Sequence, residues 1–362
     1  MRPSALLTTC LLACLLTSTA SAQAKPWVVY PGGKGPGAGR HIVFVTGDDE
    51  YRSEEGMPML AKILSVRHGF KCTVLFAIDP KTGVIQPNHQ TNIPGLEALE
   101  TADLMVLFLR FRELPDEQMA HIVKFTHSGK PIIGLRTSTH AFNYGRNKQS
   151  KYQPLTFNSG KPRGGWGGLV LGDTWLNHHG HHGRESTRGV INPKYETHPV
   201  LTGVTDIWGP TDVYGVRKLP ADAQVIVHGQ VLGGMQPTAE PVTGRKNEPM
   251  MPLAWTRAFK TDTGKTARVF CTTMGASVDL QSEGFRRLLV NACYWGVGLE
   301  DRIPTRRRRG LFGRLLRLPI RLLGQSREQK EADVRYVGEY KPTQFGFGNF
   351  VKGVKPSDHA LE

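Results

Sequence analysis

The sequence has few cysteines and no long apolar run in its body, and these shortages exclude several classes of protein. Of the five cysteines, Cys72, Cys271 and Cys293 lie in the body of the chain, far apart and inside apolar stretches. An odd, widely spaced set forms neither a disulfide framework nor a zinc finger, so we expect three buried, inert thiols. A membrane-spanning helix would need about 20 apolar residues, and the body offers no candidate.

A nucleophile is missing where an amidotransferase or a hydrolase needs one. Such enzymes expose a cysteine or a serine on the sharp turn between a strand and a helix. No cysteine lies between Cys72 and Cys271, and Ser138 lacks the Gly-x-Ser-x-Gly surroundings of a hydrolase elbow. Thiol chemistry is therefore excluded at this turn, a serine nucleophile is disfavoured, and Arg136 and His140 are its catalytic candidates.

The first residues have the layout of a secretory signal. One arginine precedes an apolar run from Ala5 to Leu16, and small residues up to Ala24 offer a cleavage site. The run is too short for a permanent anchor, so residues 1–24 are predicted to be removed and the protein to be periplasmic or secreted. A loose lipoprotein box ends at Cys14, but the apolar run continues past it, so a lipid anchor is the less favoured alternative.

Positive charge is concentrated near the C-terminus. The formal net charge is +15, and much of it comes from the arginines of residues 302–327. The rest of the chain is only mildly basic, so the charge does not indicate nucleic acid as a partner. Arg306 to Gly324 mixes arginine with apolar residues, as a helix on a membrane surface does, but Pro319 interrupts it. The main interpretation is a basic insertion or linker before a tail, 334–362, that packs on the domain; peripheral membrane contact is the alternative.

Apolar strands alternate with amphipathic helices through the first third of the body. The strands are predicted at 41–47, 71–78, 103–111 and 130–135, with helices beginning at Ser53, Pro94 and Pro115. Ser53 is suited to cap its helix. Later strands are predicted at 223–231, 253–259 and 267–273, before a closing helix at 282–298. The alternation predicts an α/β fold of the flavodoxin-like class, with a doubly wound, mostly parallel sheet.

Polar residues follow the first strand, where ligands of such sheets bind. Asp48 and Glu50 can supply acid or base chemistry, with Asp49, Tyr51 and Arg52 beside them as ligand contacts. Capping of the next helix and solubility of the loop explain the same residues equally well.

Arg136 follows the fourth strand directly. A cation at this position can hold an anionic or keto oxygen of a ligand, or it can merely pair with Asp48 or Glu50.

A long stretch rich in glycine, histidine and aromatic residues, 145–183, is predicted to be a functional loop. Imidazole is a common ligand of zinc and similar divalent metals, so His179 and His181 are candidate metal ligands. The same histidines can instead bind the hydroxyls of a polyol or be solvated. The predicted ligand contacts of this loop are Trp175, Asn177, His178, His179 and Arg184.

Several segments together resemble the ThuA-like family, the trehalose-utilisation type. In chain order they are His198–Val204, Thr211–Tyr214, Pro252–Arg257, Gly264–Phe270, and Phe285–Leu289 with Trp295. The resemblance covers most of residues 41–298 and implies the fold of class I glutamine amidotransferases, with Thr211–Tyr214 as a strand. Many relatives have Gly-x-His at the elbow, where this chain has Leu135-Arg136, and a later Gly-His becomes Gly275-Ala276.

The resemblance implies a protein that acts on or binds a carbohydrate derivative, such as a keto-sugar or a glycoside, without amidotransferase activity. In the enzymatic alternative, Asp48 and Glu50 are acid or base, Arg136 polarises an oxygen, and the histidines bind hydroxyls or a metal. The other alternative is a non-catalytic carbohydrate-binding or scaffold protein with a degenerate amidotransferase fold. Both require that the turns after the first and fourth strands meet the histidine loop.

Overall fold

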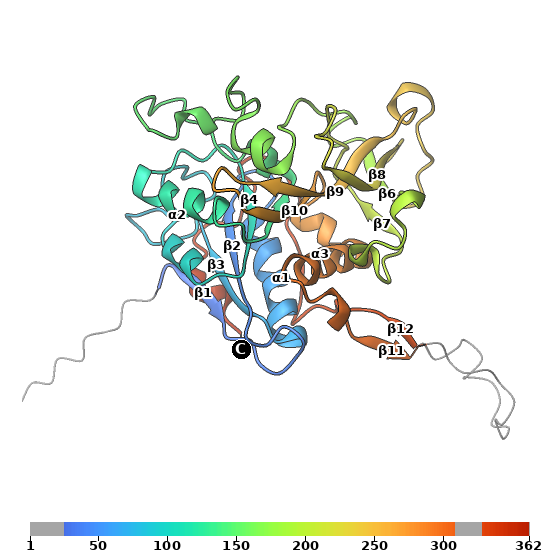
Figure 1. Cartoon of the computed structure of the whole chain (residues 1–362), viewed down its shortest axis with the longest axis horizontal. Coiled ribbons are helices and arrows are strands. Elements are labelled where there is room, and N and C mark those ends of the chain that lie inside the picture. The colour runs from blue at the N-terminus through green and yellow to red at the C-terminus, as the bar shows by residue number, and fades with distance from the viewer. Residues whose placement is uncertain (1–24, 308–327, 362) are drawn as a thin grey trace, which may run out of the picture.

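The computed structural model describes residues 25–307 and 328–361. The predicted signal (1–24) and residues 308–327 of the arginine-rich segment lie outside the described residues, so what was predicted for them stays a prediction. In the described ranges, none of the helices combines the length and the apolar character that crossing a membrane requires. The described chain is built on one ten-stranded sheet with helices on both faces (Figure 1).

The elements follow one another in a regular order. The strands of the main sheet are β1 (Trp27–Tyr30), β2 (His41–Gly47), β3 (Lys71–Leu75), β4 (Leu104–Leu109), β5 (Ile132–Leu135), β6 (Ser186–Ile191), β7 (Ile207–Gly209), β8 (Gln224–Leu232), β9 (Met251–Lys260) and β10 (Thr266–Thr272). The α-helices of the described residues are α1 (Ser53–His68), α2 (Asp116–Thr126) and α3 (Glu283–Gly296). A separate strand pair, β11 (Thr305–Arg307) and β12 (Glu328–Lys330), projects from the body (Figure 1).

The main sheet is mixed rather than mostly parallel. Its strand order is β1-β3-β2-β4-β5-β10-β9-β8-β6-β7. The central run from β3 to β10 is parallel, whereas β1 and the four strands beyond β10 pair in antiparallel fashion. The predicted α/β class is confirmed, but the prediction of a mostly parallel sheet holds only for this run. No α-helix separates β6 to β10 along the chain, so these strands have no helical crossovers to make them parallel.

The apolar strands are explained by a core on each face of the sheet. Leu60 of α1 and Leu288 of α3 belong to one core, and Met119 of α2 belongs to the other. Neighbouring residues of β2 point to opposite cores, Phe44 to the first and Val45 to the second. A strand buried on both sides needs apolar residues at every position, which is the pattern in the sequence.

The three cysteines of the body fit this core. Cys72, Cys271 and Cys293 are free and buried, as the sequence predicts. Burial raises the pKa of each thiol, which keeps it protonated and inert.

The loops after β2, β4 and β5 are held in unusual backbone conformations. The strand order reverses between β2 and β4, and sheets of this kind bind their ligands at the carboxyl ends of the strands at such a point. Arg52, Phe111 and Arg136, which follow these strands, have φ angles of 61°, 51° and 42°. Side chains other than glycine tolerate such values only where the surrounding contacts enforce them. The loops at this end of the sheet are therefore fixed by their contacts.

The start of α1 differs from the prediction that Ser53 caps this helix. The Ser53 hydroxyl accepts hydrogen bonds from the backbone amides of Gly47 and Asp48, at 3.1 and 3.0 Å. Arg52 occupies the N-cap position and makes no capping hydrogen bond. The hydroxyl is thus used to tie the end of β2 to the helix, and it closes the polar loop between them.

The C-terminal segment returns across the body and ends beside β1 (Figure 1). The Tyr30 hydroxyl donates a hydrogen bond to the carbonyl of His359 at 2.7 Å, and the amide of Ile85 donates to Val354 at 2.8 Å. On the way, the amide of Gly346 donates to the carbonyl of Glu50 at 3.0 Å. The segment therefore passes directly over the loop that follows β2.

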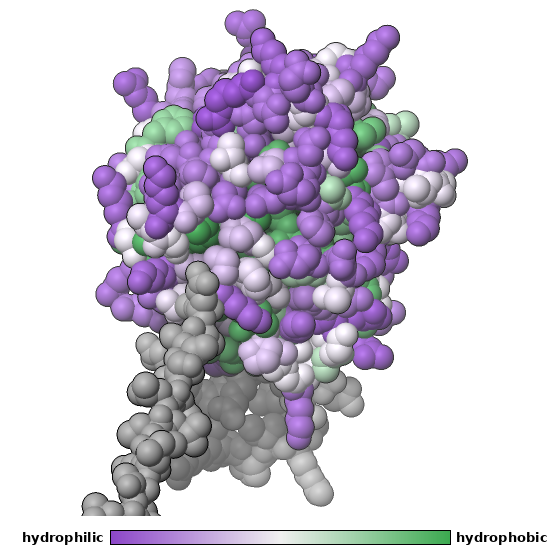
Figure 2. All heavy atoms as spheres, turned by 90° about the vertical axis from the view of Figure 1, so that its left-hand side faces the viewer, coloured by the Kyte–Doolittle hydropathy of each residue, from purple (hydrophilic) through white to green (hydrophobic). Residues whose placement is uncertain are grey.

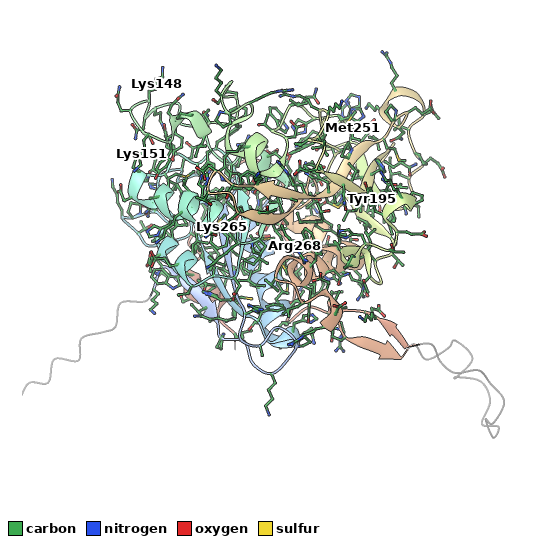
Figure 3. All side chains as sticks on the ribbon, viewed as in Figure 1. Lys148, Lys151, Tyr195, Met251, Lys265 and Arg268 are labelled. Carbon is green, nitrogen blue, oxygen red and sulfur yellow. The ribbon has the colours of Figure 1, made fainter. Side chains whose placement is uncertain are left out.

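The face on the side of β1 and α2 is mainly hydrophilic, and its apolar residues lie in small, separate areas (Figure 2). Lys148 and Lys151, in the long loop after β5, are exposed and point away from the body (Figure 3). This part of the loop thus presents charged side chains to solvent.

Glu54, in the first turn of α1, is a buried carboxyl without a partner. Neither side-chain oxygen has a hydrogen-bond partner in another described residue, and burial raises the pKa from an ordinary 4.5 to about 8. Between these values the folded protein keeps a proton that the unfolded chain releases. The free energy of unfolding therefore falls as the pH rises through this range.

We expect Glu54→Gln to stabilise the protein at pH 8, by on the order of 3 kcal/mol, and to have little effect at about pH 4.5. Thermal unfolding at both pH values measures the difference. Glu97→Gln, which changes an exposed carboxyl on the short helix Leu96–Glu100, is the matched control and should show no pH-dependent shift. An equal change in Tm on Glu54→Gln at both pH values would contradict the assignment of Glu54 as an unpaired carboxyl.

Candidate functional site

The candidate site lies where three loops meet. The Thr137 hydroxyl, after β5, donates a hydrogen bond to Asp48, after β2. Glu50 of the same β2 loop lies 3.5 Å from His182, measured from Oε1 to Nε2. The structure thus brings the turns after β2 and β5 together with the histidine loop.

Asp212, which follows β7, is the centre of the site. Its buried Oδ2 lies 2.7 Å from Nδ1 of His178, and Oδ1 lies 3.1 Å from Nδ1 of His182 and 2.9 Å from Nη2 of Arg136. An ionised carboxylate only accepts hydrogen bonds, so each neutral imidazole carries its proton on Nδ1. Nε2 of His178 then carries a lone pair with which to act as a base, whereas Nε2 of His182 lies beside Glu50.

The carboxylate of Asp212 stays ionised in spite of its burial. Burial by itself raises its pKa, but the hydrogen bonds from His178 and His182 and the positive charge of Arg136 outweigh that effect. The pKa of Asp212 therefore lies well below its usual range. The site keeps a fixed negative charge behind the two histidines.

Arg136 is completely buried at the strained turn after β5. Its Nη1 donates hydrogen bonds to the carbonyls of Thr273 and Asp212, at 2.8 and 3.2 Å. The guanidinium carbon lies 4.0 Å from the ring centroid of Tyr51 and 4.3 Å from that of Tyr214, so the cation is held between two aromatic rings. It pairs with Asp212 instead of Asp48 or Glu50, and it has no exposed surface with which to hold a ligand oxygen directly.

A second buried carboxylate fixes the backbone next to Asp212. Asp279 accepts hydrogen bonds from the Thr211 hydroxyl at 2.7 Å and from the amides of Gly275 and Ala276 at 3.0 Å each. A side chain at Gly209 would place its Cβ 2.3 Å from an Asp279 oxygen, so glycine is needed there. Asp279 thus ties the end of β10 to the segment that carries Asp212.

The two histidines form a partly open pair. Each side chain of His178 and His182 is 34% exposed, and their ring centroids are 4.7 Å apart. The ring centroid of Trp175 lies 5.8 Å from that of His178, and the ring centroid of Phe345 lies 5.1 Å from that of His182. A ligand can therefore reach both imidazoles between aromatic side chains.

The histidines grouped around a carboxylate differ from the predicted metal ligands, His179 and His181. Candidate ligand atoms of His178, His182 and Asp212 all lie within 4.8 Å of one another. His178 forms an isolated bridge with Tyr214, and the chain bends at His179. Nε2 of His179 lies 2.8 Å from the carbonyl of Lys246.

The remaining histidine of the loop turns away from the carboxylate. His181 is exposed, and its amide donates a hydrogen bond to Glu185 at 2.6 Å. Asn177 and Arg184, two predicted ligand contacts, are also exposed.

Asp48 and Asp49 serve the loop itself. Oδ1 of Asp48 accepts hydrogen bonds from the amides of Glu50 and Tyr51, at 2.8 and 2.5 Å, and the residue is fully buried. Burial also raises the pKa of Asp48. Asp49 forms an ion pair with Arg110 at 3.1 Å. The structure therefore leaves Glu50 as the acid of this loop that contacts a histidine of the site.

Glu50 lies between two positive or protonatable groups. Its carboxylate is 3.5 Å from Nε of Arg110 and 3.5 Å from Nε2 of His182, and 6% of the side chain is exposed. Burial and the nearby Asp48 raise the pKa of Glu50, against the opposing effect of Arg110.

Two predicted residues lie beside the site without facing it. His140 is 3% exposed and packs against Phe111 and Trp175, with ring centroids 5.0 and 5.5 Å away. Burial holds the pKa of His140 well below its usual range, so the ring stays neutral. Arg52 is buried and donates hydrogen bonds to the carbonyl of Gly346, which places it under the C-terminal segment.

The family described as trehalose utilisation, ThuA, matches residues 41–296 of the sequence. The chain belongs to the ThuA family. Two solved structures resemble this ThuA protein: a ThuA-like protein from Parabacteroides merdae and one from Bacteroides uniformis, with 16% and 13% identity and TM-scores of 0.45 and 0.44. The matches cover 71% and 73% of this chain, and 90% and 93% of the other chains. No curated protein matches the sequence.

The ThuA resemblance seen in the sequence is confirmed, with one correction to its details. Thr211–Tyr214 was expected to be a strand, but only Tyr214 makes an isolated bridge there, and the strand β7 (Ile207–Gly209) precedes it. The segment bends away after β7 because Thr211 is bonded to Asp279, which turns Asp212 toward the histidines.

Three residues of the candidate site were not among the sequence candidates: Asp212, Asp279 and Phe345. Asp212 lies in a segment that carried the family resemblance, so a signal existed. No motif in the sequence around Asp279 or Phe345 indicates a site. Only the fold brings these two residues to it.

We expect Arg136→Met to destabilise the ThuA protein by about 3–5 kcal/mol at pH 7, because it leaves the buried carboxylate of Asp212 without its cation. Without this charge the pKa of Asp212 rises, so the folded variant takes up a proton at a higher pH than the wild type, and its destabilisation relative to the wild type shrinks as acid is added. Urea titrations across pH 4–7 measure both effects. The double variant Arg136→Met, Asp212→Asn removes the charge as well and should recover most of the loss; no recovery would contradict the pairing.

Proposed function

We propose that the protein is an enzyme that acts on a carbohydrate derivative, with His178 and His182 as its acid–base pair. The observation that carries the proposal is one ionised, buried carboxylate, Asp212, that orients two partly exposed imidazoles. General acid–base catalysis needs groups of this kind, with protons fixed on Nδ1 and an Nε2 atom that can exchange one.

The arrangement supports proton transfer in both directions. One imidazole takes a proton on Nε2 from a hydroxyl, or from a carbon next to a carbonyl, and Asp212 stabilises the imidazolium that forms. The other, when protonated, donates to the oxygen on which negative charge develops. Arg136 acts through Asp212, because its buried guanidinium holds that carboxylate ionised and in place.

Support for a sugar derivative comes from the surroundings and from the family description. Trp175 and Phe345 border the two imidazoles with aromatic surface, and Glu50 offers a carboxylate to hydroxyl groups. Carbohydrates combine apolar ring faces with hydroxyl edges, which fits such a mixture. The ThuA family is described by trehalose utilisation, so trehalose and keto-glycosides derived from it are the first substrates to test.

We expect alanine at His178 or His182, or asparagine at Asp212, to reduce kcat on such a substrate by about 10²–10⁴-fold. Turnover of trehalose and its keto derivatives by the chain from residue 25 onward is the measurement. His179→Ala and His181→Ala are matched controls in the same loop and should leave kcat within a few-fold. Saturable binding without turnover would favour the non-catalytic alternative, and equal loss in the controls would contradict the assignment.

The same three residues favour a second candidate, a metal-dependent site. Candidate ligand atoms of His178, His182 and Asp212 lie within 4.8 Å of one another, and two histidines with one carboxylate are a common zinc set. Glu50, near Nε2 of His182, is placed to orient that ring as carboxylates do around bound metals. A divalent ion there would supply Lewis-acid chemistry.

We expect any zinc bound after dialysis to approach one ion per chain and to be lost in His178→Ala and in His182→Ala. Elemental analysis of protein without a histidine tag measures it, together with the shift in Tm on adding zinc. His181→Ala should keep the ion. Metal retained in His178→Ala, or none in the wild type, would exclude this candidate.

Export through the leader (residues 1–24) belongs to the same proposal. Its support is the sequence pattern alone, namely a short apolar run followed by small residues. A periplasmic or secreted enzyme would meet carbohydrate outside the cytoplasm.

A further inference from the structure

The C-terminal segment reaches the candidate site from outside the range that matches the family. The matched residues end at 296, whereas residues 343–347 lie against the loop after β2. The carboxylate of Glu55 accepts a hydrogen bond from the amide of Thr343 at 2.8 Å, and the backbone carbonyl of Glu50 accepts one from the amide of Gly346 at 3.0 Å. The buried Arg52 donates hydrogen bonds to two carbonyls of the same segment. Its backbone is therefore fixed on both sides of Phe345.

Phe345 forms one wall of the histidine pair. Its ring centroid lies 5.1 Å from that of His182, nearly edge to face at 64°, and 5.7 Å from that of Tyr51. The ring is half-buried. It packs against the ring of His182.

Phe347 lies next to Arg110, which pairs with Glu50, and it faces solvent. Its ring is 61% exposed, which makes it the one aromatic residue among the exposed large apolar side chains of the described chain. The guanidinium carbon of Arg110 lies 4.7 Å from this ring and 4.5 Å from the ring of Phe111. Arg110 is thus held between two aromatic rings while it pairs with Glu50.

These contacts form one continuous series. Phe345 borders His182, His182 contacts Glu50, Glu50 contacts Arg110, and Arg110 lies on Phe347. The series has an aromatic ring at each end and charged groups between them. The series leads from the histidines past Glu50 and Arg110 to Phe347.

We propose that residues 343–347 complete the site as its ligand-binding wall and make it selective for glycosides with more than one ring. This rests on the proposed function. Phe345 is a positioning residue that shields His182, and Phe347 stacks on the apolar face of the ring beyond the reacting one. Glu50 and Arg110 hold hydroxyl groups between the two rings.

The first test compares two-ring and one-ring probes. Phe347→Ala is expected to raise KM, or Kd where a probe binds without turnover, roughly three- to tenfold for trehalose and its keto derivative. The value for the corresponding methyl glucosides should stay unchanged. Val351→Ala removes a similarly exposed apolar side chain, 57% exposed, from the same segment and is the matched control. Equal effects on both probes, or none in Phe347→Ala, overturn the selectivity.

The second test needs no ligand. Phe345→Ala should make carbethoxylation of His182 by diethyl pyrocarbonate severalfold faster, as mapped by mass spectrometry, while the exposed His181 reacts as in the wild type. Phe345→Leu, which keeps apolar bulk, should give an intermediate rate and serves if the alanine variant does not fold. An unchanged rate at His182 overturns the wall.

The two tests also separate this inference from the proposed function. If His178→Ala abolishes turnover but Phe347→Ala and Phe345→Ala behave as the wild type, the acid–base assignment is supported and the ligand-binding role of residues 343–347 is refuted. If His178→Ala retains full turnover, the acid–base assignment fails, and the reactivity of His182 still decides whether Phe345 covers it.

Discussion

The ion pair between Arg136 and Asp212 is the interaction on which the rest of the site depends. Both side chains are fully buried, and a pair without access to water is stable only when its geometry is good and its other polar atoms find partners. Here backbone carbonyls and two tyrosine rings surround the cation, and two imidazoles complete the hydrogen bonds of the carboxylate. The strained turn after β5 is the conformation that points the guanidinium inward.

The acidic residues of this end of the sheet divide into two kinds. Asp48 and Asp279 are buried and accept hydrogen bonds from backbone amides, so they hold loops in place. Asp212 and Glu50 instead contact histidines that solvent can reach. In a chemical mechanism the first pair would fix the framework and the second pair would meet the changes in charge. The tightly bonded loops explain how a site made from distant segments keeps its geometry.

Sequence reasoning located the strands of the parallel run, the α-helices and the loops of the site, because apolar periodicity is a local signal, but it did not predict β1, β6 or β7. His41–Gly47 and the helix that ends before Gly69 were predicted within a residue or so. The antiparallel half of the sheet was not foreseen, since pairing direction depends on connections rather than on any single strand.

Side-chain roles were harder to predict than elements. Asp48 looked like an acid of the site because it follows a strand, but its oxygens bind its own loop and Thr137. Four histidines in a row gave no sign of which would face a carboxylate. That choice is set by Asp212, which is 30 residues from His182 and 34 from His178 along the chain and close only in the fold.

The hydrogen bond between Glu50 and Gly346 joins residues from opposite ends of the chain. During synthesis the parallel strands and their helices can form before this contact is available, because residue 346 is made after all of them. A polypeptide cut short after α3 would lose Ala332 and Val334 from one apolar core, together with the cover on Arg52 and His182. The C-terminal segment therefore supports the scaffold and the candidate site at the same time.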